Sequence, residues 1–103
     1  MEPMVKMKLF NVVYDDDKKD VDIICVPNSI ALSIKKVTQE FLRWLPHAKE
    51  EMYWTTVNGN RCSVCETAGF VSWLNNNYCE CESEATIVEE HVNYNDNYDT
   101  IEF

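Results

Sequence analysis

Two short stretches near the N-terminus have the pattern of β-strands. Residues 5–13 alternate apolar with polar side chains, and residues 21–26 form a short β-branched run that Pro27 closes. Alternation at every second position places one set of side chains on one face of a strand. The charged segment 15–20 between the two stretches is typical of a solvated turn. We therefore expect an antiparallel hairpin near the N-terminus.

After Pro27 the apolar spacing changes to that of a helix. Asn28 or Ser29 can cap its start, and Pro46 ends it because the residue before a proline disfavours helical geometry. Apolar side chains then recur three or four positions apart, which places them on one helical face. They are Ile30, Ile34, Val37, Phe41 and Leu45.

A second hairpin is predicted by Asn58 and Gly59, because a type I′ turn needs positive φ at both central positions. A two-residue loop pairs Val57 with Asn60.

A shorter helix follows, beginning near Thr67 and ending in an asparagine run. Strands are expected over 85–92 and 100–103, separated by a turn-rich segment.

These elements predict a single α+β domain over residues 1–103. About five strands in the order ββαββαβ would form one antiparallel or mixed sheet, with two helices packed on one face. This arrangement is the simplest that buries the apolar stripes of both helices. The chain has 103 residues, of which 46% are hydrophobic, so it can bury one modest core.

Charge is distributed unevenly along the chain. The net charge is -9, from 18 acidic and 9 basic residues. From Cys62 to Phe103 there are nine acidic residues and no Lys or Arg, whereas the charges of the preceding part cancel. Such a surface repels nucleic acid and anionic membranes, and it attracts basic proteins at long range.

Several function classes have no support in the sequence. With two glycines the chain offers no phosphate-binding loop, and no net basic stretch is present to bind nucleic acid directly. No apolar run approaches the length of a signal peptide or a membrane span. No motif specifies a reaction or a cofactor. The cysteine count of five is odd, so we expect reduced thiols and a cytoplasmic protein.

The leading hypothesis is a non-enzymatic protein that occludes a basic surface of a protein partner. Alternating glutamates around residue 82 and a glutamate pair in the next strand would supply the charge, and two tyrosines would anchor the contact. The expected contact residues are Glu80, Glu82, Glu84, Glu89, Glu90, Tyr94 and Tyr98. The partner would be a nucleic-acid-binding enzyme, and the chain itself would be a monomer or a homodimer.

The general profile resembles the small acidic proteins that bacteriophages make to block host enzymes, including anti-CRISPR proteins and other inhibitors of host defence. This similarity is one of size and charge. It implies an inhibitor acting in the host cytoplasm, and it transfers no individual residue.

Two alternatives remain open at this stage. One is a small domain with a structural zinc, since thiolates at C-x-x-C spacing commonly bind that metal; its ligands would be Cys62, Cys65, Cys79 and Cys81. The other is an aromatic pocket for a small signalling molecule, lined by Trp44, Tyr53, Trp54, Phe70 and Trp73. Aromatic residues at such spacing are also typical of an ordinary core.

Overall fold

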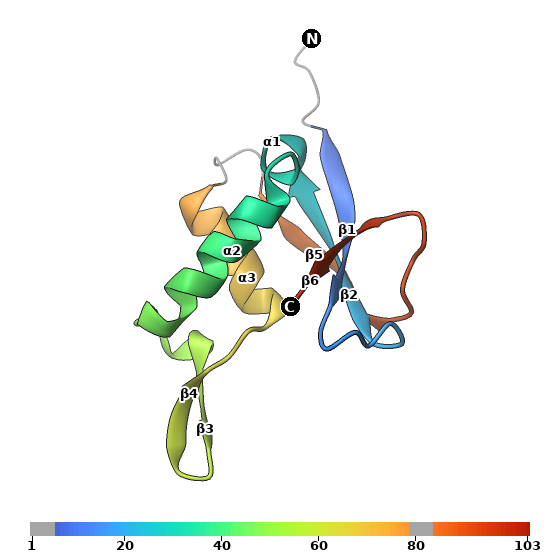
Figure 1. Ribbon diagram of the computed structural model, residues 1–103. Coiled ribbons are helices and arrows are strands. Elements are labelled where there is room, and N and C mark those ends of the chain that lie inside the picture. Colours follow the sequence, from blue (N-terminus) through green and yellow to red (C-terminus); the bar gives the residue numbers. More distant parts are fainter. Residues whose placement is uncertain (1–5, 79–83) are drawn as a thin grey trace.

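The computed structural model describes residues 6–78 and 84–103. Its main sheet has four strands in the order β5-β2-β1-β6 (Figure 1). The two central strands form the predicted antiparallel hairpin, β5 pairs antiparallel with β2, and β6 pairs parallel with β1. The strands are β1 (Met7–Val13), β2 (Val21–Pro27), β5 (Thr86–Val92) and β6 (Asp99–Glu102). The sheet is therefore mixed, and β5 and β6 are its two edges.

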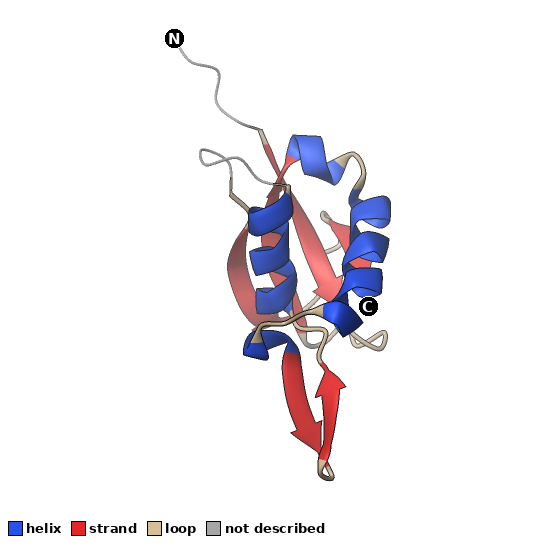
Figure 2. Cartoon of the chain, turned by 90° about the vertical axis from the view of Figure 1, so that its left-hand side faces the viewer, coloured by secondary structure: helices blue, strands red, loops and turns tan. Residues whose placement is uncertain are grey.

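The helices cover one face of this sheet (Figure 2). They are α1 (Asn28–Ala31), α2 (Ile34–Trp44) and α3 (Thr67–Asn77), with short 3₁₀ turns η1 (Leu45–His47) and η2 (Glu51–Tyr53). Between the helices and the sheet, the rings of Phe10, Phe41 and Phe70 are almost completely buried. The predicted α+β class, with helices packed on one face of a sheet, is confirmed.

The first helix differs from the prediction in its continuity. The stripe from Ile30 to Leu45 predicted one helix, but the chain turns at Leu32 and Ser33 and divides it into α1 and α2. Leu32 points away from the core and is 89% exposed. The apolar spacing is compatible with helix on both sides of the turn, so periodicity alone could not reveal the break.

The second hairpin has the predicted register but lies outside the main sheet. Strands β3 (Trp54–Val57) and β4 (Asn60–Ser63) form a two-stranded sheet of their own and extend away from the body (Figure 1). Val57 pairs with Asn60 as expected, and Asn58 and Gly59 both have positive φ. Side chains from 55 to 63 are exposed, so this hairpin has no apolar face to bury on the larger sheet.

A second apolar cluster lies on the face of the sheet opposite the helices. Val13, Val21 and Ile23 are buried there, under Tyr94 and Tyr98 from the loop between β5 and β6.

Asn11 holds that loop in place, since its side chain is fully buried. Its Nδ2 donates to the carbonyl oxygens of Asn95 (2.9 Å) and Tyr98 (3.1 Å), and its Oδ1 accepts from the Asn95 N–H (2.9 Å). A buried amide satisfied in this way fixes the path of the chain that covers the outer face.

Candidate partner-binding surface

Strand β5 is held at its start by a side chain from α3. Asn75 forms a two-point clamp on Ala85: the Ala85 N–H donates to Oδ1 (2.7 Å), and Nδ2 donates to the Ala85 carbonyl oxygen (3.0 Å). Ala85 itself is buried. This clamp fixes where β5 begins, with Glu84 exposed immediately before it.

The middle of β5 does not alternate as a regular strand does. Its pairing with β2 shifts register on both sides of Ile23, and His91 has a φ of 54°. Extra residues in one strand of an antiparallel pair form bulges that bend the strand and redirect side chains. As a result Glu89 and Glu90 are both exposed, next to Val88, which is 51% exposed.

Carboxylates from β2 and the turn before it lie beside the end of β5. His91 Nδ1 is 2.8 Å from Asp20 Oδ1, and the His91 N–H donates to Asp22 Oδ1 at 3.2 Å. The hydrogen bond to Asp20 and the charge of that carboxylate raise the pKa of His91. The charges of Asp22 and Glu90 act in the same direction. We call Asp20, Asp22, Glu89 and Glu90 the acidic β5 patch.

Asp22 is held in its position by a chain of hydrogen bonds beneath the patch. The Thr67 hydroxyl, at the start of α3, donates to Asp22 Oδ2 and lies 2.8 Å from the Tyr14 hydroxyl. Because Thr67 has one proton to give, the Tyr14 hydroxyl must be the donor in the second bond. Burial raises the pKa of Tyr14, which keeps this donor protonated.

The acidic residues of the C-terminal part do not all gather on this patch. Asp99, at the opposite edge of the sheet, forms an ion pair with Lys8. Within residues 6–78 and 84–103, no ion pair joins a Lys or Arg to Glu84, Glu89 or Glu90. The β5 edge therefore keeps negative charge that the lysines do not neutralise.

The remaining predicted contact residues lie elsewhere or outside the described part. Tyr94 and Tyr98 are half-buried against the outer face of the sheet. The Tyr94 hydroxyl lies 2.6 Å from Thr100 Oγ1, and Lys18 Nζ lies 5.0 Å from its ring centre. These tyrosines pack the loop onto the sheet. Glu80 and Glu82 fall outside the described residues.

The two predicted zinc ligands that the structure describes lie in different surroundings. Cys62 is exposed on β4, whereas Cys65 packs against the core. Burial, with a smaller contribution from the charge of Glu66, raises the pKa of the Cys65 thiol to about 11. No group of three potential ligands is present in the part of the chain that the structure describes. Cys79 and Cys81 lie outside that part.

Four of the five aromatic residues proposed as a pocket pack against one another. Trp44 and Tyr53 meet edge to face with ring centres 4.9 Å apart, and Phe70 and Trp73 are stacked at 6.5 Å. Trp54 donates its indole N–H to the Ala48 carbonyl oxygen at 2.8 Å. This arrangement is that of a core filled by rings.

Sequence reasoning singled out Glu89 and Glu90 but missed Asp20, Asp22 and His91 as their neighbours. The one local signal was Asp22, a charged residue within the apolar run of β2. Its bond to His91 joins residues 69 positions apart, and no local pattern encodes such a contact.

Comparisons with known proteins found no matching family model, no matching curated protein and no matching solved structure. No helix among the described residues is both long and apolar enough to span a membrane.

Proposed function

We propose that this protein is a non-enzymatic binder that docks on a basic surface of another protein through the acidic β5 patch. The observation that supports the proposal most directly is the position of Glu89 and Glu90. Both are exposed, with no Lys or Arg ion pair among the described residues, and they lie on the strand whose His91 contacts Asp20 and Asp22. The class of partner with a suitable surface is a nucleic-acid-handling or defence enzyme of a host, which the protein would inhibit by covering its groove.

Ion pairs at an exposed surface increase the rate of association more than the affinity. Single exposed ion pairs contribute roughly 0.2–1 kcal/mol, so the carboxylates mainly steer the encounter and set its orientation. The exposed side chain of Val88, between the clamp at Ala85 and the glutamate pair, provides apolar area next to the charges. Screening by salt should weaken the interaction, since the Debye length falls to about 3 Å at 1 M salt.

The test compares two variants with the same change in net charge. E89Q/E90Q removes the adjacent pair in the patch, and E50Q/E51Q removes an adjacent exposed pair next to the β3–β4 hairpin. Tagged wild-type protein and both variants are used to capture proteins from a host lysate at low and high salt, and the captured proteins are quantified by mass spectrometry.

The proposal predicts a basic protein that is captured at low salt by the wild type and by E50Q/E51Q, but is lost or strongly reduced with E89Q/E90Q. Equal loss with both variants would show that overall charge, not the patch, is responsible. Undiminished capture by E89Q/E90Q would refute the proposal.

A further inference from the structure

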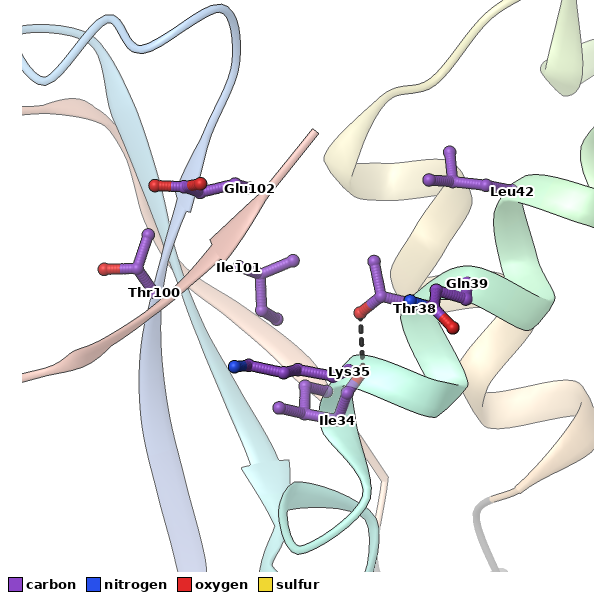
Figure 3. A pocket seen from close by; sticks show the side chains of 8 residues that line it. All are labelled: Ile34, Lys35, Thr38, Gln39, Leu42, Thr100, Ile101 and Glu102. Atoms are coloured by element: carbon purple, nitrogen blue, oxygen red, sulfur yellow. Dashed lines mark hydrogen bonds between the residues drawn. The ribbon is translucent and has the colours of Figure 1, made fainter.

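A groove runs between α2 and the edge strand β6 (Figure 3). It has a volume of about 410 Å³. Its apolar walls are Ile34 and Leu42 from the helix and Ile101 from the strand, and Lys35 extends from α2 toward β6. Leu42 is 41% exposed, so an apolar side chain placed in this groove would contact surface that is now partly open to water.

Among the described residues, none pairs with the backbone groups on the outer side of β6 along this groove. The Phe103 N–H donates to the Val13 carbonyl oxygen at 2.9 Å, so residue 103 directs its main-chain groups toward β1. Successive residues of a strand direct these groups to alternate sides. Thr100 and Glu102 therefore direct their N–H and C=O groups away from β1, to the outer edge of the sheet.

The two edges of the sheet differ in their readiness to accept another strand. β5 is interrupted by register shifts, and bulges of this kind protect an edge from pairing. β6 pairs with β1 in continuous register from Asp99 to Glu102. The regular edge is therefore the one that lies beside the groove.

We propose that the groove between α2 and β6 binds an extended segment of a partner protein, which adds as a strand to β6. One apolar side chain of that segment would enter between Leu42 and Ile101. The next residue would point to the opposite face, where Glu102 is exposed, and there a basic side chain is favoured. The ligand is thus an extended stretch that alternates apolar and basic residues.

A second copy of this chain is a poorer occupant than such a segment. Each copy has a net charge of -9, and pairing two copies through four-residue strands would bring these charges together. Large net charge of one sign opposes self-association. A basic segment gains the same main-chain hydrogen bonds while reducing the charge.

The test uses a proline that blocks the edge without disturbing the sheet. In E102P the ring replaces an N–H that points outward, so pairing with β1 is kept. E102A is the matched control, because it removes the same carboxylate and keeps the N–H. The probe is a synthetic peptide of alternating lysine and valine, titrated into isotope-labelled protein and followed by amide shifts in NMR spectra.

We expect peptide-induced shifts in β6 and α2, and an affinity about tenfold lower for E102P than for E102A, as loss of an edge hydrogen bond and the bulk of the ring predict. A peptide alternating glutamate and valine should bind more weakly. Equal affinity of E102P and E102A, or shifts confined to β5, would overturn the proposal.

A second pair of variants covers the case in which E102P does not fold. L42A removes a wall of the groove, and L32A makes the same change at a leucine outside it. Only L42A should weaken peptide binding, and equal effects of the two variants would contradict the proposal.

Sedimentation of the wild type provides a further outcome. A dimer that L42A dissociates would make a second copy of the chain the occupant of the groove, and the partner-segment proposal would be wrong. The groove uses none of the residues of the acidic β5 patch, so E89Q/E90Q should keep the peptide-induced shifts in β6 and α2.

Discussion

The buried amide of Asn11 should contribute more to stability than any other polar side chain on the outer face of the sheet. N11A removes three hydrogen bonds to the loop before β6, two to Asn95 and one to Tyr98. A typical hydrogen bond contributes about 1 kcal/mol net to folding. Because the loop groups left without partners are only half-buried, water can reach some of them, and the cost should be about 2–4 kcal/mol.

That cost is a large share of the total stability, which for a domain of this size is about 5–15 kcal/mol. The melting temperature should fall by roughly 10–20 °C. Urea unfolding gives the free energy directly, and amide hydrogen exchange should show the Asn95 N–H losing protection first. N11D should be less stable than N11A at neutral pH, because a carboxylate cannot donate and would face two carbonyl oxygens.

The control for this prediction is N76A, at an exposed position on α3. It should change the free energy of unfolding by no more than about 0.5 kcal/mol. If N11A costs no more than this control, the Asn11 amide does not hold the loop, and the apolar packing of the two tyrosines alone must keep the outer face covered.

Three further predictions concern separate parts of the molecule. Asp20 raises the pKa of His91, so protonation of this histidine should stabilise the fold below its unfolded pKa of about 6.5, and the stabilisation should disappear as pH rises through the pKa of the folded state. NMR titration of the ring should show a lower pKa of His91 in D20N. G59A forces a side chain into the left-handed region at a φ of 80° and should destabilise the β3–β4 hairpin by about 1 kcal/mol. Hydrogen exchange should then become faster for the amides of that hairpin and stay unchanged for those of the core. With a thiol reagent near pH 8, exposed Cys62 should react quickly. Cys65, with its pKa raised to about 11, should react only slowly until the chain unfolds. Equal reaction rates of the two thiols would show that Cys65 is accessible.

Short-range features of the fold could be predicted from the sequence because they depend on neighbouring residues. The Asn58-Gly59 turn determined its own register through backbone conformation, and the structure has both residues at positive φ. The break between α1 and α2 could not be predicted in this way. The apolar stripe continues across Leu32 and Ser33, so the spacing of apolar residues carries no signal for the break.

Long-range features had no comparable signal. The parallel pairing of β6 with β1 joins residues near 100 to residues near 11, and a short acidic segment gives no indication of its partner strand. The same holds for the candidate site. Composition identified a negative C-terminal part, but only the fold shows that Asp99 is paired with Lys8, while Glu89 and Glu90 lie on the edge strand whose His91 contacts Asp20.

The most direct test of the proposed function is zero-length cross-linking of the protein to a captured partner. A carbodiimide joins a carboxylate to a lysine amine only where the two are in contact, and mass spectrometry of the cross-linked peptides then identifies both residues. The proposal predicts bonds from Glu89 or Glu90 to lysines of the partner. Bonds formed from Glu50 or Glu51 instead, with none from β5, would contradict it.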